Sequence, residues 1–296
     1  MREPVIEVPV LVLGSEGMLG QACTRWLERY QGWGVGGTTY LDHKHPLHFD
    51  VLEGLGKLCE ILRKRRYNYA INCIGVLSSA ISNSDWRSVE TAIRVNALFP
   101  HQLAATAMEY GCRVIHISTD GVFSGNSTGD YTENSPVDCP DTYGRTKGLG
   151  ECAADNVLNI RCSIIGRDWM GGKGILEWVL RMPPGSSVTG FCDYVWSPVT
   201  TFQFAELCRR IMEGDAFERL RAESSVHHFA PNRAISKYEL LAMLNEITGR
   251  HLQIQRGSST GGPIRRVLAN RSEAIPRLYQ TGEEWPDVLR GALQDI

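Results

Sequence analysis

Tyr143 and Lys147 are the two residues of this sequence whose types and spacing most directly suggest chemistry. They stand four residues apart, so on a helix their side chains share one face and can meet over the same point. The pKa of a free tyrosine is about 10. A neighbouring ammonium and the positive charge of a bound cofactor would favour the phenolate and lower that pKa toward neutrality. Such a tyrosine can act as general acid toward a carbonyl group, or as general base in the reverse reaction. Alone, the same spacing also describes an ordinary pair on a helix surface.

A hydroxyl group that orients the reacting oxygen is expected upstream of this pair. Ser118, Thr119 and Asp120 stand at the end of the apolar run 113–118. In α/β proteins the carboxyl ends of parallel strands carry the ligands. The sequence therefore predicts that Ser118 or Thr119 presents its hydroxyl beside Tyr143.

A glycine-rich segment near the N-terminus predicts a dinucleotide site. Gly14, Gly17 and Gly20 are spaced Gly-x-x-Gly-x-x-Gly, directly after the apolar run 8–13 and at the start of an expected helix. In this context the first glycine takes the tight turn, the second lets backbone amides approach a pyrophosphate, and the third lets helix and sheet pack closely. The alternative is a glycine-rich turn that binds nothing.

The end of the second expected strand bears on the choice between the two nicotinamide cofactors. Residues 37–40 carry no Asp or Glu that would hold the ribose 2′-hydroxyl of NAD and repel a 2′-phosphate. The hydroxyls of Thr38 and Thr39, with Lys44 close by, can instead accept that phosphate. We therefore expect NADP(H) to bind at least as well as NAD(H), with Asp42 as the residue that would reverse the preference.

Two weaker signals lie close to this segment. Asp50, followed by Val51, can present a carboxylate to the adenine amino group. His43, His45 and His48 are numerous enough to ligate a metal. Because no Cys or carboxylate pattern of known zinc sites accompanies them, we predict a solvated loop and no metal.

The residues above must be positioned by helices and strands. Apolar strand-like runs alternate with amphipathic stretches along the first half of the chain, which indicates a parallel sheet with helices on both faces. We predict an α/β fold with a Rossmann-type doubly wound sheet over residues 1–165. Beyond residue 166, loops rich in Gly and Pro separate helical segments, so residues 166–296 are expected to form a smaller C-terminal substrate lobe, interleaved with the first. Ser236 and Glu239 form a capping box at a helix start, and Gly249 ends that helix. Strands are expected near 8–13, 34–40, 69–74, 113–118 and 158–165.

Composition narrows the classes of partner. The 296 residues carry a formal net charge of −2, without the excess of Lys and Arg that binds nucleic acid. No apolar run reaches the roughly 18 residues that span a bilayer. The nine Cys are scattered without a Cys-x-x-Cys pair, which argues against disulfides and structural zinc. We therefore predict a cytoplasmic protein with a small-molecule substrate and without nucleic-acid or membrane partners; a homodimer is compatible with the sequence.

Together these motifs closely resemble those of the dTDP-4-dehydrorhamnose reductase group, which belongs to the extended short-chain dehydrogenases/reductases. The occurrence of all these motifs together, in the same order and spacing, identifies a family far more specifically than any single motif. The resemblance covers residues 8–166 firmly and the C-terminal part more loosely. It rests on Gly14 to Gly20, Asn72, Gly75, Val95, Asn96, His116 to Asp120, Val122, Phe123, Tyr131, Glu133, Tyr143, Lys147, Glu151 and Arg161.

The resemblance implies NAD(P)H-dependent reduction of a nucleotide-linked 4-keto-6-deoxy sugar. Thr119, Tyr143 and Lys147 would form the catalytic triad, with Tyr143 giving a proton while hydride goes to the keto carbon. Asp120 and Ile164 would join Thr119 and Tyr143 around the sugar. The implied cofactor-binding residues are Gly14, Gly17, Met18, Leu19, Gly20, Thr39, Asp50, Val51, Cys73, Ile74, Gly75, Tyr143 and Lys147.

Two positions depart from the pattern of this family. Gly121 stands where the family commonly has Tyr, and Ile164 where it commonly has Trp, and both positions face the sugar in relatives. Losing two aromatic walls would enlarge this part of the pocket and make it less polar. We therefore expect an active enzyme whose sugar differs from 4-dehydrorhamnose.

Two other functions stay open. A sugar-nucleotide epimerase or dehydratase would retain NAD and cycle it between oxidised and reduced forms, but a dehydratase needs a Glu after Asp120, where this chain has Gly121. A non-catalytic dinucleotide-binding regulatory subunit, similar to the β-subunit of methionine adenosyltransferase, also resembles this reductase group, and the intact triad counts against that role. Trp169, Trp178 and Trp196 could stack on a nucleotide base, although core packing is expected for at least two of them.

Overall fold

β1 (Val8–Leu13) is buried on both faces, as its unbroken apolar run predicts. Val10 and Val12 pack into one hydrophobic layer, and Leu11 and Leu13 into the opposite one. A strand covered on both sides is typical of a parallel sheet that lies between two layers of helices.

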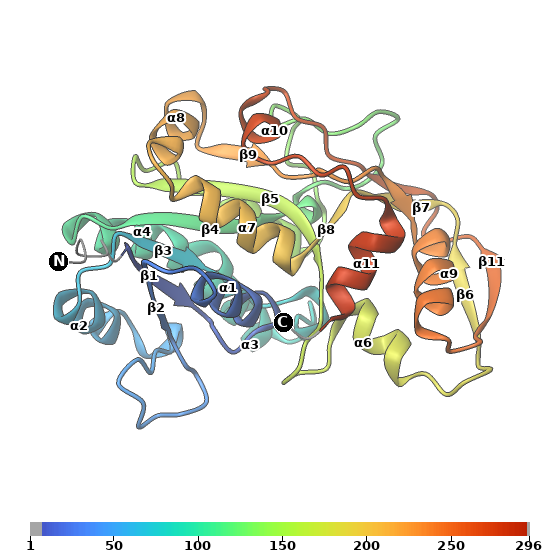
Figure 1. Ribbon diagram of the computed structural model, residues 1–296, viewed down its shortest axis with the longest axis horizontal. Coiled ribbons are helices and arrows are strands. Elements are labelled where there is room, and N and C mark those ends of the chain that lie inside the picture. The colour runs from blue at the N-terminus through green and yellow to red at the C-terminus, as the bar shows by residue number, and fades with distance from the viewer. Residues whose placement is uncertain (1–7, 295–296) are drawn as a thin grey trace.

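Every strand pairing in the large sheet around β1 is parallel. The computed structural model describes residues 8–294, and in it the strand order is β2-β1-β3-β4-β5-β8, with β9 also paired to β5. The order reverses direction between β1 and β3, where open α/β sheets bind ligands. The doubly wound Rossmann-type fold is therefore confirmed (Figure 1). The strands are β2 (Trp33–Gly37), β3 (Tyr69–Asn72), β4 (Arg113–Thr119), β5 (Val157–Ile165), β8 (Pro198–Thr200) and β9 (Val226–His228).

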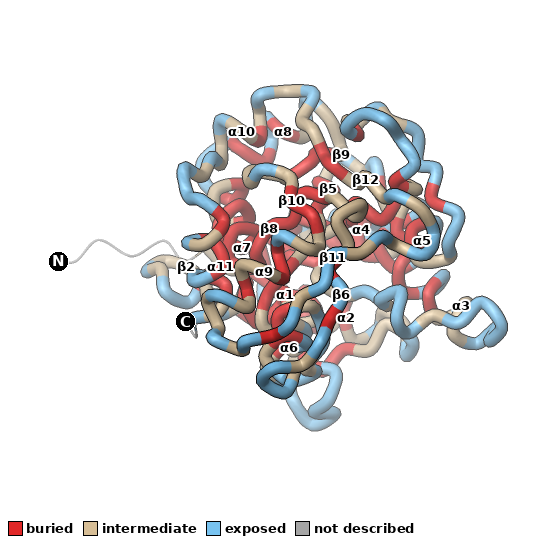
Figure 2. The backbone as a smooth tube through the Cα atoms, turned by 90° about the vertical axis from the view of Figure 1, so that its right-hand side faces the viewer, coloured by how far each residue is buried: buried red, intermediate tan, exposed pale blue. Residues whose placement is uncertain are grey.

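Two layers of helices cover the two faces of this sheet. α1, α7, α8 and α10 pack on one face through residues such as Leu27 and Phe204, and α2 and α4 pack on the other through Leu62 and Leu103. α3 and α5 contact the π-helical segment Ile93–Leu98 that leads into α4. Buried residues concentrate where these layers meet (Figure 2). The helices are α1 (Met18–Glu28), α2 (Gly56–Lys64), α3 (Trp86–Ala92), α4 (Phe99–Glu109), α5 (Thr142–Leu149), α7 (Thr201–Ile211), α8 (Ala216–Glu223) and α10 (Ala274–Leu278).

The remaining elements form a smaller lobe with its own core, on the right of Figure 1. Trp196, Leu240 and Trp285 are among its buried residues. The predicted capping box is present at the start of α9, where Ser236 Oγ accepts a hydrogen bond from Glu239 N. This lobe contains α6 (Gly174–Arg181), α9 (Lys237–Thr248), α11 (Trp285–Leu293), β6 (Ser187–Phe191), β7 (Tyr194–Trp196), β10 (Ile235–Ser236), β11 (Gln253–Gly257) and β12 (Ile264–Arg266).

The chain passes between the two lobes more than once. β8 and β9 lie beyond residue 166, yet both pair with β5 in the large sheet. α7 and α8, which flank them in sequence, pack on the same sheet. Residues after 166 therefore contribute to both lobes.

Two strands end earlier than expected. β2 stops at Gly37 because Thr39 pairs with His48 of the following loop, so the chain turns away from β1. β3 stops at Asn72, whose side-chain oxygen accepts a hydrogen bond from Ile74 N at 3.2 Å and starts a turn. In both places a polar contact replaces the sheet ladder.

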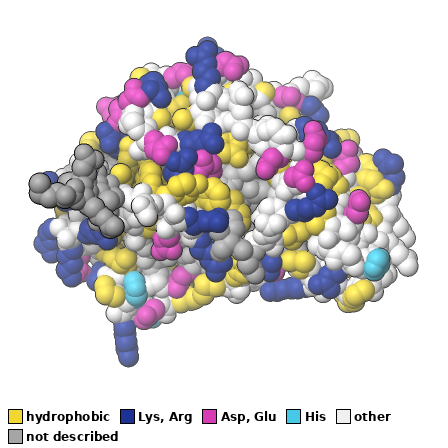
Figure 3. Space-filling model, in the orientation of Figure 1, with side chains coloured by type: hydrophobic (Ala, Val, Ile, Leu, Met, Phe, Trp, Pro, Cys, Tyr) yellow, Lys and Arg dark blue, Asp and Glu magenta, His cyan; other side chains and the backbone are white. Residues whose placement is uncertain are grey.

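The surface carries charges of both signs. Lys and Arg lie interspersed with Asp and Glu over the face shown in Figure 3. Among residues 8–294, no helix combines the length and the apolar character needed to cross a membrane.

Candidate active site

Thr119 and Tyr143 converge on one point at the carboxyl edge of the large sheet. Thr119 is the last residue of β4, and Tyr143 lies in the first turn of α5. A Cβ atom placed on Gly121 would lie 3.1 Å from the Tyr143 ring and 3.2 Å from Thr119 Oγ1. Two hydroxyl-bearing side chains, predicted from the sequence to meet, therefore flank the same small space.

Local hydrogen bonds explain why these side chains are held there. Thr119 Oγ1 accepts a hydrogen bond from Gly121 N at 3.0 Å and caps the short 3₁₀-helix Asp120–Val122. Asp141 Oδ1 caps α5 by accepting from Gly144 N at 2.8 Å. α5 approaches this 3₁₀-helix so closely that a Cβ at Gly144 would lie 2.2 Å from the carbonyl oxygen of Gly121.

Burial governs the acidity of Tyr143. It raises the pKa of Tyr143 to about 12, and the negative charge of Asp120 acts in the same direction, whereas the Thr119 hydroxyl opposes both. Tyr143 is therefore protonated throughout the neutral range. The lowering of this pKa expected from a neighbouring ammonium together with the positive charge of a bound cofactor stays a prediction.

Lys147 shares the helix with Tyr143, but its ammonium points to the sheet. Lys147 Nζ donates a hydrogen bond to the carbonyl oxygen of Ile117 at 2.6 Å. Burial lowers the pKa of Lys147 to about 8, and the carboxylate of Glu151 partly offsets that effect. The side chain is therefore a buried cation held by the sheet.

A charged cluster from the small lobe completes the site. Burial raises the pKa of Asp120 to about 6, against the opposing charges of Arg266 and Lys237. Lys237 Nζ lies 4.8 Å and 4.4 Å from the ring centres of Tyr194 and Trp196. Arg266 Nε is buried without a hydrogen-bond partner among the described residues. Two cations thus stand beside the acidic neighbour of Thr119.

Sequence reasoning missed these two cations. Lys237 lies inside the capping box that starts α9, and the motif suggested only a structural role. Arg266 ends β12, more than a hundred residues from Asp120 in the chain. No local pattern connects the three side chains, because only the packing of the small lobe brings them together.

A buried ion pair lies beneath the site. Arg161 on β5 donates from Nε and Nη2 to the two carboxylate oxygens of Glu151 at 2.7 Å and 2.6 Å. Ser118 Oγ donates to the same carboxylate at 2.6 Å. The ion pair fixes the end of α5 against β4 and β5. This structural role explains the presence of Glu151 and Arg161, and neither residue needs a part in the reaction.

The three glycines of the glycine loop meet three different demands. Gly14 has a φ of +77°, which favours glycine. A Cβ at Gly20 would lie 2.1 Å from the carbonyl oxygen of Gly14, so α1 could not pack as it does. At Gly17 the nearest atom to an added Cβ is 3.5 Å away, so the fold itself leaves room for a side chain there. Gly17 also starts α1 without a side-chain cap, and Met18 and Leu19 follow in its first turn.

The hydroxyls expected to receive a 2′-phosphate are already engaged. Thr38 Oγ1 accepts a hydrogen bond from Gly14 N at 2.9 Å. Thr39 Oγ1 donates to the carboxylate of Glu16 and accepts from Asp42 N at 3.2 Å. Glu16, a residue that sequence reasoning did not single out, lies at the centre of this region.

The other residues expected around the cofactor lie on neighbouring loops. Asp50 Oδ1 accepts from Leu52 N at 2.8 Å and caps the 3₁₀-helix that begins at Val51. Its proposed contact with adenine stays a prediction. Asn96, in the π-helical segment before α4, accepts from Val76 N at 2.8 Å and donates to Val76 O at 2.9 Å. That pair of bonds holds the loop that contains Cys73, Ile74 and Gly75.

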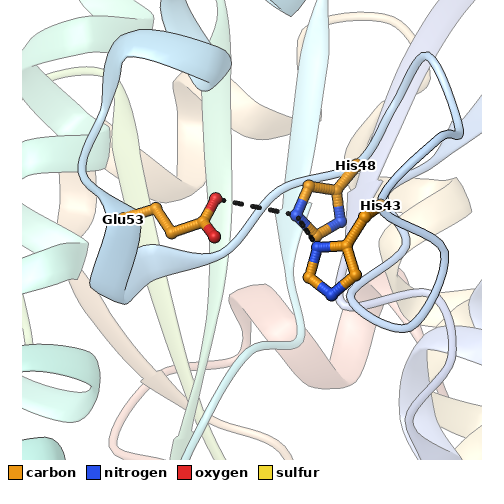
Figure 4. A group of neighbouring side chains, drawn as sticks. All are labelled: His43, His48 and Glu53. Carbon is orange, nitrogen blue, oxygen red and sulfur yellow. Dashed lines mark hydrogen bonds and ion pairs between the residues drawn. The ribbon is translucent and has the colours of Figure 1, made fainter.

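His43 and His48 meet near Glu53, a carboxylate absent from the sequence interpretation of this loop (Figure 4). His43 Nδ1 lies 3.2 Å from His48 Nε2, which lies 3.7 Å from Glu53 Oε2. A hydrogen bond and an ion pair account for these contacts. His43 and His45 are exposed, as expected of a solvated loop, whereas His48 is buried. The absence of a bound metal stays a prediction.

The remaining candidate residues differ in their surroundings. Ile164 packs against the core layer of β5 that also contains Cys162, so its contact with a sugar stays a prediction. Trp196 is buried in the core of the small lobe. Trp178 is 44% exposed, and Trp169 lies against the guanidinium groups of Arg25 and Arg167. The expectation of core packing for at least two tryptophans is wrong, because only one of the three is a core residue.

Comparison with known proteins identifies one family and several relatives, among them proteins named as reductases. A family model described as RmlD substrate binding domain matches residues 8–272. The spore coat polysaccharide biosynthesis protein SpsK of Bacillus subtilis (strain 168) is 24% identical, with 97% of each chain covered. The probable low-salt glycan biosynthesis reductase Agl14 of Haloferax volcanii is 27% identical over 80% of this chain and 79% of the relative. A dTDP-4-dehydrorhamnose reductase of Streptomyces griseus is 30% identical over 58% of this chain and 53% of the relative.

Solved structures share the fold. A dTDP-4-dehydrorhamnose reductase of Clostridium acetobutylicum superimposes with a TM-score of 0.76 at 20% identity, covering 96% of this chain and 98% of the other. The corresponding reductase of Bacillus anthracis, solved in complex with NADP, gives a TM-score of 0.75 at 16% identity, covering 97% and 98%. At these identities the likeness concerns the architecture of the two lobes.

Proposed function

The chain belongs to the RmlD substrate binding domain family, and we propose that it reduces the keto group of a nucleotide-linked 4-keto-6-deoxy sugar with hydride from a nicotinamide dinucleotide. The observation that carries this proposal is the convergence of Thr119 and Tyr143 on one point beside Gly121. The names of two relatives, one a glycan biosynthesis reductase and one a reductase of a dTDP-linked sugar, support the same class of reaction.

The glycine loop fits a dinucleotide. Gly17 is the N-cap of α1 and makes no side-chain cap, so the positive end of this helix is open to a pyrophosphate. The space beside Gly17 that a side chain would fill is free of protein atoms closer than 3.5 Å. A dinucleotide bound there supplies the hydride.

Tyr143 acts as the general acid. Hydride addition to the keto carbon moves the carbonyl electron pair to oxygen, and the proton of the Tyr143 hydroxyl neutralises that oxygen. The raised pKa, about 12, keeps the proton on Tyr143 until the oxygen becomes basic. The Thr119 hydroxyl donates to Asp120 Oδ1 at 3.3 Å in the structure, and it would turn to donate to the substrate oxygen instead. Solvent returns the proton to Tyr143 afterwards.

Lys147 stabilises and positions the groups around the reaction. Its ammonium, fixed by the Ile117 carbonyl, adds positive charge beneath the site where negative charge develops on oxygen. The family resemblance implies that the same ammonium would also hydrogen-bond the ribose of the nicotinamide. Lys147 is therefore expected to affect both cofactor binding and turnover.

The small lobe suits a substrate that carries negative charge and hydroxyls. Lys237 and Arg266 supply two cations, and Asp120 supplies an acceptor for a sugar hydroxyl. A nucleotide-linked sugar presents both chemistries, since its diphosphate is anionic and its ring bears hydroxyls. This arrangement favours such a sugar over a small uncharged ketone.

One assay separates this function from its alternatives. The purified protein is mixed with NADH or NADPH and a panel of dTDP- and UDP-linked 4-keto-6-deoxy sugars, and nicotinamide absorbance and sugar products are followed. Stoichiometric oxidation of the cofactor with a new sugar hydroxyl supports the reductase. Isomerised sugar without net cofactor oxidation would indicate an epimerase, and cofactor binding without turnover on any sugar would indicate a regulatory subunit. The cytoplasmic location and a homodimer stay predictions from the sequence.

A further inference from the structure

Glu16 joins the glycine loop to the end of β2 through three hydrogen bonds. One carboxylate oxygen accepts from the Thr39 hydroxyl, and the other accepts from Tyr40 N at 2.7 Å and Leu41 N at 3.0 Å. Burial of the carboxyl group alone would raise its pKa, but these three donors together bring the pKa below its usual range. Glu16 is therefore a fixed negative charge at neutral pH.

The position of this carboxylate is set by the packing of the two segments. Ser15 Oγ donates to Thr38 O at 2.8 Å, one residue before Thr39. A Cβ at Gly37 would lie 2.6 Å from Ser15 Oγ, so the end of β2 and the glycine loop are in direct contact. Glu16 thus has little freedom to swing away when a ligand approaches.

This place in the fold is where a dinucleotide presents its adenosine ribose. In Rossmann-type sheets the ribose 2′-hydroxyl lies at the end of the second strand, and an acidic group there accepts its hydrogen bond. Residues 37–40 at the end of β2 contain no Asp or Glu. The structure supplies a carboxylate at the same place from the glycine loop, through Glu16.

The surroundings of Glu16 oppose a phosphate. The backbone amides of Tyr40 and Leu41, which could have held phosphate oxygens, already donate to Glu16. The charge of Asp42 acts on Glu16 as a second nearby carboxylate. The hydroxyl of Thr39 is committed to the same carboxylate.

We propose that Glu16 is the residue that selects NAD(H) over NADP(H), by accepting a hydrogen bond from the ribose 2′-hydroxyl and repelling a 2′-phosphate. This inference rests on the proposed use of a nicotinamide dinucleotide. It opposes the preference for NADP(H) expected from the hydroxyls of Thr38 and Thr39, because the Thr39 hydroxyl donates to Glu16 itself and Thr38 Oγ1 already accepts a hydrogen bond from Gly14 N.

Direct binding of each reduced cofactor to the whole protein, without sugar, tests the proposal. The parent is expected to bind NADH at least about tenfold more tightly than NADPH, since like charges in contact are strongly unfavourable. Glu16→Gln keeps the size of the side chain and removes its charge, so NADPH should bind about tenfold more tightly to it, while NADH changes by less than about threefold. Glu28→Gln, at the far exposed end of α1, removes the same charge away from the site and should change neither affinity.

Ionic strength gives a second reading that needs no variant. Salt screens the repulsion between Glu16 and a 2′-phosphate, so the disadvantage of NADPH relative to NADH should shrink as salt rises. Equal affinities of the parent for both cofactors, or equal changes for both in Glu16→Gln, would overturn the role of Glu16 alone. If neither cofactor binds the parent, the proposed function and this inference are both overturned.

Discussion

Lys147 donates a hydrogen bond from its ammonium to the carbonyl oxygen of Ile117, a residue of β4 thirty positions earlier in the chain. This bond places a cation inside the protein, where burial lowers its pKa to about 8. The folded protein therefore binds fewer protons than the unfolded chain between pH 8 and the ordinary lysine pKa of 10.5. Its stability accordingly rises with pH across that window.

Lys147→Met should thus stabilise the protein most below about pH 8, where the buried ammonium is charged at a cost. The difference in stability between variant and parent should shrink as the pH rises toward 10.5. Denaturant unfolding of both proteins at about pH 7 and about pH 9.5 measures that difference. A difference that stays constant with pH would show that Lys147 titrates normally in the folded state.

Tyr143→Phe should reduce turnover at least about a hundredfold, the usual cost of losing a general acid. Cofactor affinity should change little, because the phenyl ring keeps the packing of the side chain. Single-turnover rates with a confirmed sugar, together with a cofactor titration, test both parts. Near-normal turnover would remove Tyr143 from the mechanism.

Gly17→Val should weaken dinucleotide binding without unfolding the protein. The fold has room for a Cβ at Gly17, whereas a Cβ at Gly20 would lie 2.1 Å from a backbone oxygen. Gly20→Ala is therefore the contrasting variant, expected to lose stability. Calorimetry of cofactor binding and thermal melts of both variants decide the matter, and unchanged binding by Gly17→Val would make the loop an ordinary turn.

Lys237→Gln should raise the KM for the sugar nucleotide several-fold and leave the affinity for the cofactor unchanged. The reason is that the Lys237 ammonium lies over Tyr194 and Trp196 in the small lobe, which we propose binds the substrate. Lys57→Gln, which removes a half-exposed cation of α2 paired with Glu60, serves as control. A loss of cofactor affinity in Lys237→Gln with unchanged KM would contradict the placement of the substrate.

Glu151→Ala should cost about 3–5 kcal/mol of folding free energy, since it leaves the buried guanidinium of Arg161 without its partner. Both side chains of this pair are less than a tenth exposed, at 7% and 5%. Asp130→Ala breaks the exposed pair with Arg265 and should cost at most about 1 kcal/mol. The denaturant midpoints of the two variants measure the loss of stability in each. Equal losses of stability would mean that burial does not make the Glu151–Arg161 pair more important than the exposed pair.

The sequence predicts those features whose cause is local. The apolar run of β1, the three glycines after it and the four-residue spacing of Tyr143 and Lys147 each reflect a short segment and its immediate geometry. These predicted the fold, the close packing of the glycine loop and the convergence of Thr119 with Tyr143. The capping box at Ser236 was predictable for the same reason.

Features that depend on distant packing could not be predicted in this way. Lys237 and Arg266 reach Asp120 only because the small lobe folds over the sheet edge. Glu16 reaches the end of β2 only because Gly37 allows that strand to approach the glycine loop. The burial that dominates the pKa of Tyr143 is also a property of the whole site, so the spacing of Tyr143 and Lys147 could not predict it.

The return of β8, α7, α8 and β9 to the large sheet constrains how the protein can be made. On a ribosome the first 165 residues emerge before β8 and β9, which pair with β5, and before α7, whose Phe204 packs on the sheet. Residues 1–165 look like a complete nucleotide-binding unit in the sequence. Their apolar surface nevertheless stays partly uncovered until α10, which ends at Leu278, has been synthesised. A gene fragment that ends at residue 165 would encode a sheet with one face partly uncovered. Neither lobe could therefore be exchanged between relatives by a simple fusion at that boundary.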